Sequence, residues 1–189
     1  MKITLVYMAA GNSRRFGGNK LLYPLAGKPM YRHLLDRLLA VCARHTGWEI
    51  VLVTQYGEIA EDVSGLPLAC VLSPDSEKGI SHSIRAGVSA SPDACAWVFF
   101  AADQPFFTEE SAEGFLLAME RSAAELGAVT SGGERGNPVW FSRKYREELL
   151  SLEGDTGGRR ILKSHPEDVA LYEIADPREL SDIDTRDNI

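Results

Sequence analysis

Cysteine is scarce in this chain of 189 residues, which contains three cysteines and four histidines. Cys42, Cys70 and Cys95 are widely separated, and they form neither a C-x-x-C pair nor, with the histidines, the spacing of a zinc site. The sequence therefore supports neither a disulfide framework nor a structural zinc centre. We expect three buried thiols in a reducing compartment.

Long apolar runs and an excess of positive charge are missing as well. The N-terminal run MKITLVYMAAG soon reaches glycine, and no later segment approaches the roughly 20 apolar residues that span a bilayer. We therefore expect no signal peptide, no membrane anchor and a cytoplasmic location. Lys and Arg number 20 against 27 Asp and Glu, a net charge of −7. This balance argues against broad binding to nucleic acid, although it is compatible with a local basic pocket.

Internal repeats, low-complexity tracts and Pro/Ser-rich linkers are also absent from the sequence. At 44% apolar residues, a chain of this length can bury a substantial core without cross-links. We therefore expect one domain that covers residues 1–189.

Short apolar runs alternate with helical patterns along the first two thirds of the chain. Four of these runs are typical of strands buried on both faces, at residues 3–8, 50–54, 68–72 and 96–101. Apolar residues recur at helical spacing between Met30 and Cys42. Further helices are predicted over residues 81–90 and 108–126, the second with Thr108 as its N-cap.

This alternation predicts an α/β fold, with a mostly parallel sheet covered by helices on both faces. The last third is expected to add short strands and helices at the ligand edge, at residues 137–141, 143–150, 157–164 and 169–174. In open parallel sheets the ligand crevice lies at the carboxyl ends of the strands. Functional residues are therefore expected just after Met8, Leu72 and Ala101.

A glycine-rich segment with basic side chains follows the first predicted strand. Its glycines allow the backbone to approach a ligand closely, and Arg15 and Lys20 supply positive charge, so the segment can cradle an anion. An ordinary glycine-rich turn is the alternative. The spacing matches neither G-x-G-x-x-G nor G-x-x-x-x-G-K-[ST], which disfavours a dinucleotide-binding fold and a P-loop. The candidate nucleotide contacts here are Ala9, Ala10, Gly11, Asn12, Ser13, Arg15, Gly17 and Lys20.

The order A-A-G-x-S-x-R-x-G, followed by Lys20, resembles the signature loop of the MobA/MocA-like nucleotidyltransferases. The similarity continues through residues 21–30 and reappears in the middle and at the end of the chain. The resemblance implies a Rossmann-like three-layer α/β/α nucleotidyltransferase fold, in which this loop wraps the triphosphate of the incoming NTP. It also implies catalytic roles for Arg15, Lys20 and Asp103.

Asp103 follows the fourth predicted strand, in the sequence A-A-D-Q-P. A carboxylate at the crevice suits Mg²⁺, which favours carboxylates, waters and phosphate oxygens. Asp and Pro are also common in a turn that merely ends a strand. The family resemblance implies that Asp103 is the catalytic metal ligand, with Mg²⁺ as the cofactor and Mn²⁺ as an alternative.

Near the C-terminus, L-S-D-I-D-T resembles the family's D-I-D-T-P-E-D ending, with R-D-N in place of P-E-D. Alternation along a strand would turn Asp182 and Asp184 to one side and Ile183 to the other. The resemblance implies that Asp184 is a second metal ligand, and Asp182 is an open alternative. A solvated acidic tail would explain the same residues.

Three other stretches resemble family patterns. Gly79, Ser81 and Ser83 begin a predicted helix, where N–H groups and hydroxyls can bind a base or ribose, or the serines can simply cap the helix. The stretches R-G-N-P-V and G-D-T-G-G-R-R resemble acceptor-facing regions of the MocA branch. The candidate acceptor contacts are Asn137, Asp155 and Arg159. Asn137 stands where the family usually has His, so no acid–base role carries over. For Asp155 and Arg159, a helix N-cap followed by exposed arginines is the alternative explanation.

The sequence therefore predicts a nucleotidyltransferase that moves CMP from CTP to the terminal phosphate of molybdopterin and releases pyrophosphate. A-A-G and D-Q-P are closer to the cytidylyltransferase branch than to the guanylyltransferase branch, which usually shows A-G-G. The alternatives are GTP or another NTP, a sugar phosphate or methylerythritol phosphate as acceptor, and a noncatalytic protein that delivers the cofactor to an apo-enzyme. A molybdenum hydroxylase is the expected recipient, and neither nucleic acid nor a membrane is an expected partner.

Overall fold

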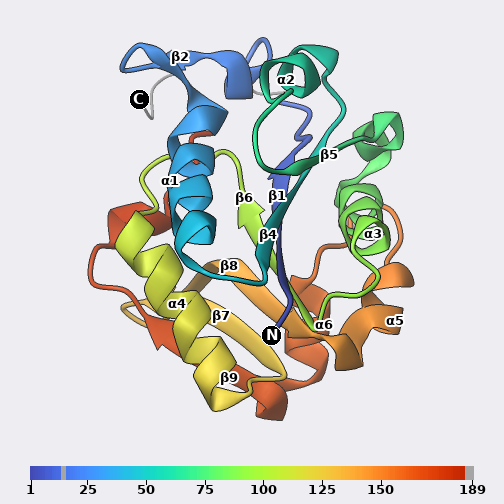
Figure 1. Ribbon diagram of the computed structural model, residues 1–189, viewed down its shortest axis with the longest axis vertical. Coiled ribbons are helices and arrows are strands. Elements are labelled where there is room, and N and C mark those ends of the chain that lie inside the picture. Colours follow the sequence, from blue (N-terminus) through green and yellow to red (C-terminus); the bar gives the residue numbers. More distant parts are fainter. Residues whose placement is uncertain (14–15, 186–189) are drawn as a thin grey trace.

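A twisted sheet forms the centre of the computed structural model, which describes residues 1–13 and 16–185 (Figure 1). Among these residues, seven strands pair in the order β5-β4-β1-β6-β8-β7-β9. Their bounds are β1 (Ile3–Ala9), β4 (Trp48–Thr54), β5 (Ala69–Leu72), β6 (Ala96–Ala101), β7 (Leu126–Ser131), β8 (Glu134–Ser142) and β9 (Val169–Glu173). A separate hairpin of two short strands is formed by β2 (Pro24–Leu25) and β3 (Lys28–Pro29).

Most of the strands run in the same direction. β1 pairs in parallel with β4 and β6, β4 with β5, and β7 with β9. β8 is antiparallel to both of its neighbours, β6 and β7. The predicted mostly parallel sheet is therefore confirmed, with β8 as the reversed strand among the described residues.

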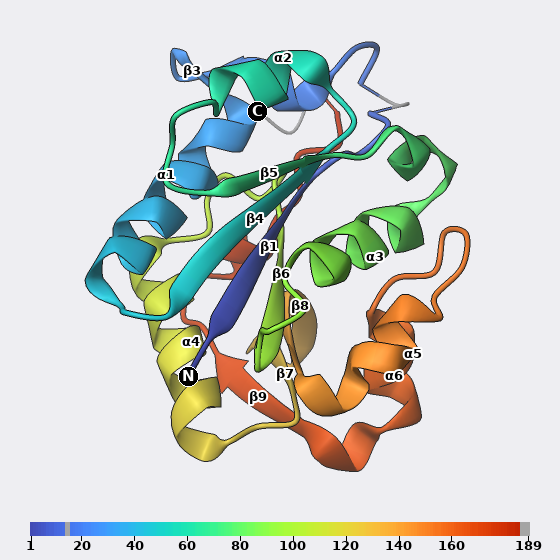
Figure 2. The ribbon, with the colours of Figure 1, turned by 45° about the vertical axis from the view of Figure 1, so that its right-hand side comes forward.

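Helices cover both faces of the sheet, so the predicted three-layer α/β/α fold is confirmed (Figure 2). One face packs against α1 (Met30–Arg44), α2 (Gly57–Asp62) and α4 (Glu109–Ser122). The other face packs against α3 (Ile80–Ala90), α5 (Arg146–Leu150) and α6 (Arg159–Ser164). Among the described residues, no helix is long and apolar enough to cross a membrane.

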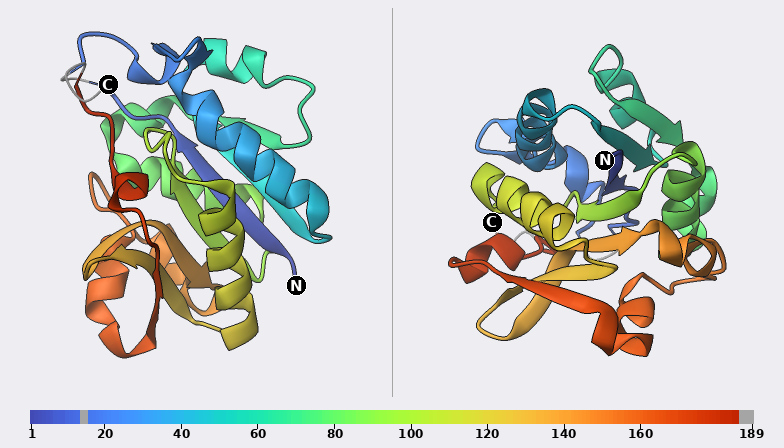
Figure 3. Two further views of the ribbon diagram at one scale, coloured as in Figure 1. Left: turned by 90° about the vertical axis from the view of Figure 1, so that its left-hand side faces the viewer. Right: turned by 60° about the horizontal axis from the view of Figure 1, so that its bottom comes forward.

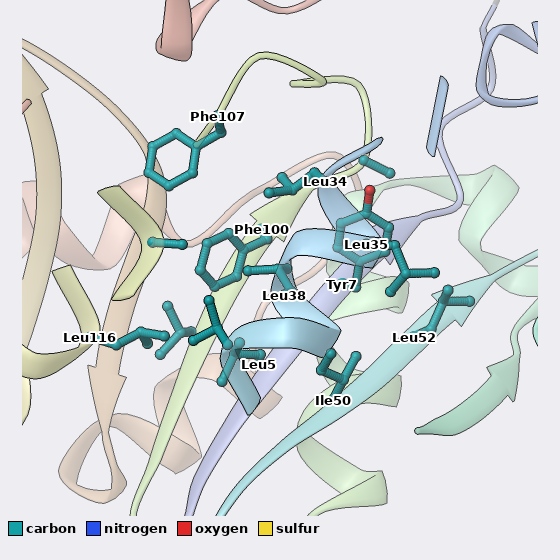
Figure 4. Packing of buried hydrophobic residues seen from close by; sticks show 14 of the residues in the cluster. Leu5, Tyr7, Leu34, Leu35, Leu38, Ile50, Leu52, Phe100, Phe107 and Leu116 are labelled. Carbon is teal, nitrogen blue, oxygen red and sulfur yellow. The ribbon is translucent and has the colours of Figure 1, made fainter. Parts of the chain in front are cut away.

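The central strands bury both of their faces because successive side chains point to opposite sides of the sheet. In β1, Leu5 and Tyr7 join the cluster under α1 and α4, whereas Val6 joins the cluster under α3. Figure 4 shows the first cluster, where Leu34, Leu38 and neighbouring side chains from α1 pack onto the strands. A strand that is buried on both faces needs apolar residues at successive positions, and this explains the nearly unbroken apolar run at residues 3–8.

One predicted helix was too long, and the strand that follows it was missed. The helix predicted over residues 108–126 begins after Thr108, whose hydroxyl accepts from the N–H of Ser111 at 3.1 Å, but it ends at Ser122. Ala123 ends it in a left-handed conformation (φ 50°), a role that glycine usually takes. Leu126 instead begins β7, a strand that the sequence pattern did not indicate.

The expectation of three buried thiols was also wrong. Cys70 and Cys95 are exposed and Cys42 is half-buried. Cys70 lies on β5, an edge strand with little covering, and Cys95 lies in the turn before β6. Burial, with a smaller effect from the nearby Glu49 carboxylate, raises the pKa of Cys42 to about 12, which keeps this thiol protonated and unreactive at neutral pH.

We expect Gly87→Ala to lower the free energy of unfolding by about 1–3 kcal/mol, the usual cost of overpacking a tight contact. An added Cβ at Gly87 would lie 2.4 Å from Cγ1 of Val6, where α3 meets β1. Gly57→Ala is the matched control, because no described atom lies within 4 Å of its added Cβ. Urea unfolding of the two variants would measure the difference, and equal stabilities would contradict this account of the α3–β1 contact.

Candidate active site

The crevice lies where β1 and β6 end, as expected for the carboxyl ends of parallel strands. It contains two adjoining cavities. The loop-side cavity, about 270 Å³, is lined by the segment after β1, the start of α3 and Asp103. The β8-side cavity, about 390 Å³, is lined by β6, β8 and the segment around Asp155. Both cavities share the lining residues Met8, Ile80, Ala101, Asn137, Asp155 and Asp182, so they form one continuous crevice.

Side chains from the end of β4 fasten the glycine-rich loop. Nε2 of Gln55 donates to the carbonyl of Ala10 at 2.7 Å and to Oδ1 of Asn12 at 2.9 Å. The hydroxyl of Tyr56 donates to the carbonyl of Gly11 at 2.6 Å. Nδ2 of Asn12 in turn donates to the carbonyl of Glu77 at 2.9 Å. The side chain of Asn12 thus holds the loop in shape, and Asn12 lines the loop-side cavity together with Ala10 and Gly11.

The loop then folds back on itself to present Lys20. Ser13 adopts a positive φ of 49°, and its hydroxyl accepts from the N–H of Lys20 at 3.2 Å. Gly17 also needs the left-handed region, with φ 76°, which glycine adopts without steric cost. Ala9 is buried in the core at the end of β1. Arg15, predicted to hold the triphosphate, lies outside the described residues.

Lys20 joins the two carboxylates that the sequence singled out. Its Nζ lies 2.7 Å from Oδ2 of Asp103 and 2.9 Å from Oδ1 of Asp184, although these residues are 83 and 164 positions away in sequence. The Lys20 side chain is only 8% exposed. Burial by itself would lower the pKa of Lys20, but the two carboxylates outweigh it and the pKa is raised, so the ammonium stays charged at pH 7.

The chain brings Asp184 to this point after β9, when it runs back past the start of α4 and the end of β6 (Figure 3). The N–H of Ile183 donates to the carbonyl of Asp103 at 3.0 Å, and the Ile183 side chain is buried with Phe16 and Met30. Residues 181–184 form neither helix nor strand, so the alternation considered for Asp182 and Asp184 is not that of a regular strand. The alternation still holds, because the aspartates on either side of Ile183 face the crevice and Lys20.

Asp182 lies on the lining of both cavities. Although the residue is exposed, partial loss of water around its carboxyl raises the pKa to about 6, with repulsion from Asp103 and Asp184 adding to the effect. Asp103 and Asp182 thus both line the loop-side cavity, and the ammonium of Lys20 contacts Asp103 and the neighbouring Asp184.

The start of α3 forms the opposite wall. Gly79 has φ 141°, and a Cβ there would lie 2.3 Å from the carbonyl oxygen of Gly154, so only glycine permits this approach. The N–H of Ser81 donates to the same carbonyl at 3.2 Å. Ser81 is fully buried and its hydroxyl has no hydrogen-bond partner among the described residues. Ser83 lines the loop-side cavity and donates to the hydroxyl of Ser76 at 2.8 Å.

The three predicted acceptor residues come together in the β8-side cavity. Asn137 reaches it from β8, Arg159 from the start of α6, and Asp155 from the segment between α5 and α6. The remaining wall is mostly apolar and is formed by Met8, Ile80, Ile84, Phe99, Phe100 and Val139. Its volume falls in the range of small-molecule sites, roughly 300–1,000 Å³. The cavity can therefore hold a flat apolar ring with polar groups at its edge.

The carboxylates fit a hard divalent cation that shares its shell with a substrate. Among the described residues, no group of three His, Cys, Asp or Glu is arranged to hold a metal by itself. Asp103 and Asp184 contact the same ammonium, so the two carboxylates lie on the same side of the site and next to one positive charge. Mg²⁺ is commonly bound by one or two carboxylates together with waters and substrate phosphates. This donor set suits Mg²⁺ or Mn²⁺ and does not suit a closed zinc cage.

Several contributing residues were not predicted from the sequence. Gln55 and Tyr56 hold the loop, and Gln104 donates from Nε2 to the carbonyl of Leu180 at 3.1 Å. Glu179, which binds the start of α4, was also missed. These residues act across long sequence separations, so no local spacing signals them. The apolar wall was missed because Ile80 and Phe99 look like ordinary core residues in sequence.

Comparison with known proteins gives a consistent family assignment. The MobA-like NTP transferase domain matches residues 5–169. The purine catabolism protein PucB of Bacillus subtilis (strain 168) is 35% identical, over 95% of this chain and 90% of PucB. The molybdenum cofactor guanylyltransferase of Serratia proteamaculans (strain 568) is 30% identical, over 85% of this chain and 83% of that protein.

Solved structures share the fold over the whole chain. The crystal structure of Rv0371c from Mycobacterium tuberculosis H37Rv has a TM-score of 0.80 and 26% identity, covering 100% of this chain and 96% of that chain. A second crystal structure of Rv0371c, a complex with manganese, has a TM-score of 0.74 and 23% identity, covering 93% of this chain and 90% of that chain.

Proposed function

This chain belongs to the MobA-like NTP transferase family, and from this premise we propose that it transfers CMP from CTP to the terminal phosphate of molybdopterin, releasing pyrophosphate. It is thus a nucleotidyltransferase. What we propose is that CTP is its nucleotide and molybdopterin its acceptor. The observation that carries the proposal is the contact of Lys20 with Asp184 and with Asp103, which lines a crevice that continues into a larger, mostly apolar cavity.

The loop-side cavity is the proposed nucleotide site. Gly11 and Asn12, with Gly79 and Ser83 opposite, line a space that extends to Asp103, the partner of the Lys20 ammonium. Transfer of a nucleotidyl group depends mainly on alignment of the reactants and on neutralising negative charge. A loop held at three points by Gln55, Tyr56 and Asn12 supplies fixed donors for this purpose.

Asp103 and Asp184 are the proposed ligands of a divalent cation, Mg²⁺ or Mn²⁺. When bound, such an ion supplies positive charge to phosphate oxygens and favours departure of pyrophosphate. The residues of the chain fix the two carboxylates, one at the end of β6 and the other on the segment that Ile183 attaches to Asp103. Lys20 contacts both carboxylates and balances their charge.

In the proposed reaction, an oxygen of the acceptor's terminal phosphate attacks the α-phosphorus of CTP. A new P–O bond forms, the bond between the α-phosphorus and the bridging oxygen breaks, and pyrophosphate leaves with the electron pair. Lys20 orients the triphosphate and compensates its charge. A phosphate monoester with a second pKa near 6 is largely ionised at pH 7, so the reaction requires no strong general base.

The β8-side cavity supports a pterin acceptor over a sugar phosphate. Its wall is largely apolar, which suits one face of a planar ring, and Asp155 and Asn137 can bind the polar edge of the ring. Arg159 can bind the phosphate. A polyol such as methylerythritol phosphate carries several hydroxyl groups and would leave them against Phe99, Phe100 and Val139, which offer no hydrogen bonds.

The choice of nucleotide needs a test of its own, because one relative is named a guanylyltransferase. CTP is proposed on the A-A-G and D-Q-P motifs. We expect pyrophosphate release with CTP and molybdopterin to exceed release with GTP, ATP or UTP by at least about tenfold in kcat/KM. A coupled pyrophosphate assay with each NTP and each acceptor would measure this ratio, and preference for GTP would overturn the cytidylyl assignment.

The alternative of a noncatalytic delivery protein for a molybdenum hydroxylase makes a different prediction in the same assay. Such a protein would bind the cofactor tightly and release no pyrophosphate with any NTP. The ion pairs of Lys20 with both aspartates favour the enzyme, since cofactor storage requires no paired carboxylates at a nucleotide loop.

A further inference from the structure

A buried carboxylate binds the start of α4, outside the crevice. Glu179, only 6% exposed, accepts at Oε2 from both the N–H and the hydroxyl of Thr108, each at 2.8 Å. Its Oε1 accepts from the hydroxyl of Ser111 at 3.0 Å. The charge also lies at the positive end of the dipole of a 14-residue helix. A buried carboxylate with three donors on two oxygens is a strong and directional attachment.

Glu179 belongs to the same segment as Asp184. This C-terminal segment, residues 177–184, is attached at successive points to residues 103–111, which run from just after β6 into the first turn of α4. Glu179 binds Thr108 and Ser111, the carbonyl of Leu180 accepts from Gln104, and the N–H of Ile183 donates to the carbonyl of Asp103. Among these three attachments, Glu179 supplies the charged one.

Asp184 depends on such attachments for its place. Residues 181–184 belong to no helix or strand, so no regular backbone ladder fixes them. Asp103, in contrast, directly follows β6 in the centre of the sheet. An aspartate on an irregular segment keeps a defined distance from Asp103 only if the segment is fixed nearby.

We infer that Glu179 is a positioning residue for the proposed metal site, fixing the C-terminal segment so that Asp184 stays beside Asp103. This inference rests on the proposed role of the two aspartates as metal ligands. Glu179 itself touches neither nucleotide nor metal; it acts through the segment that carries Asp184. Residues that orient metal ligands typically affect metal affinity by about 10- to 100-fold when they are changed.

The test is Glu179→Gln with Mn²⁺ as the probe. The amide keeps the size of the side chain but replaces one acceptor oxygen with an NH₂ group, which cannot accept from Thr108 or Ser111. We expect the dissociation constant for Mn²⁺, followed by electron paramagnetic resonance of free Mn²⁺, to rise about tenfold. CTP binding measured with EDTA should change less than twofold, and saturating Mg²⁺ should restore kcat.

The matched control is Glu173→Gln. Oε1 of Glu173 accepts from the N–H of Gly132 at 2.8 Å, away from the crevice, so this variant also weakens a Glu–backbone hydrogen bond. It should leave Mn²⁺ affinity unchanged. If Glu179→Gln fails to fold by circular dichroism, Ser111→Ala replaces it, because this variant removes one donor and keeps the carboxylate. The expected rise in the Mn²⁺ dissociation constant is then about two- to fivefold.

Two results would overturn the inference. One is unchanged Mn²⁺ affinity in a folded Glu179→Gln or Ser111→Ala variant. The other is an equal loss of Mn²⁺ and CTP affinity, because that would indicate a general disturbance of the fold. The proposed function fails separately, if the wild-type chain itself releases no pyrophosphate with any NTP.

Discussion

Asp103→Asn is expected to reduce kcat for pyrophosphate release by at least about 1,000-fold, the upper range for loss of a single charge-stabilising group. Asparagine keeps the shape of the side chain but removes the charge that the proposed cation requires. It also removes the carboxylate that lies 2.7 Å from the Lys20 ammonium. The assay is steady-state pyrophosphate release over a range of Mg²⁺ concentrations.

The fold should survive this substitution, because Asp103 lies at the crevice and packs in neither core. Asp93→Asn is a suitable control, since Asp93 is exposed in the turn before β6, at the opposite end of the same strand. It should retain full activity. Undiminished Mg²⁺-dependent turnover by Asp103→Asn would remove Asp103 from the metal site.

Lys20→Met should lower kcat/KM for the NTP by about 100- to 1,000-fold, mainly through weaker triphosphate binding and lost charge neutralisation. Methionine fills most of the buried space of the lysine stem, so packing near the loop is kept. The variant also leaves Asp103 and Asp184 close together without the ammonium between them. Their mutual repulsion should further disturb the site.

Lys28→Met provides a matched comparison. Nζ of Lys28 also lies 2.7 Å from an aspartate oxygen, that of Asp36, but this lysine is exposed on β3. An exposed ion pair of this kind contributes about 0–1 kcal/mol, so both activity and stability should stay near wild type. Isothermal titration with CTP would separate binding from turnover. Equal effects of the two variants would mean that Lys20 has no special role in the site.

The central parallel strands and the helix between the first two of them could be predicted because the sequence pattern of each is typical of one kind of element. Apolar runs such as residues 3–8 and 96–101 can be buried only in strands that are covered on both sides, and helical spacing between Met30 and Cys42 indicates a helix with one apolar face. Their alternation then leads to a parallel sheet. Because ligands bind where such strands end, the position of Asp103 made it a candidate, and the family resemblance then distinguished it from an ordinary turn residue.

Two features outside the central strands were harder to predict. β7 was not predicted, and its first residue, Leu126, was taken as the end of a helix, because Ala123 terminates α4 without the usual glycine and Leu126 continues the apolar pattern. The exposure of Cys70 depends on β5 being an edge strand, a fact of strand order that the sequence of β5 does not contain. Both errors come from tertiary context overriding a local signal.

The candidate site, like the fold, could be predicted only in part. Lys20 and Asp184 could be named because they belong to motifs, but the attachment of their segments could not. Tyr56 and Glu179 each hold a segment far away in sequence through hydrogen bonds to backbone or hydroxyl groups. Such partners follow no spacing rule, since only the folded chain brings them together.

Because β8 is antiparallel to β6, the crevice is built from strands that run in opposite directions. The parallel strands β1 and β6 lead at their carboxyl ends into the glycine-rich loop and Asp103, whereas β8 contributes Asn137 and Val139 from its middle. Val139 and Arg159 line the β8-side cavity alone, whereas Asn137 and Asp155 line both cavities. Changes at Val139 and Arg159 could therefore alter the acceptor while the loop-side cavity keeps its lining.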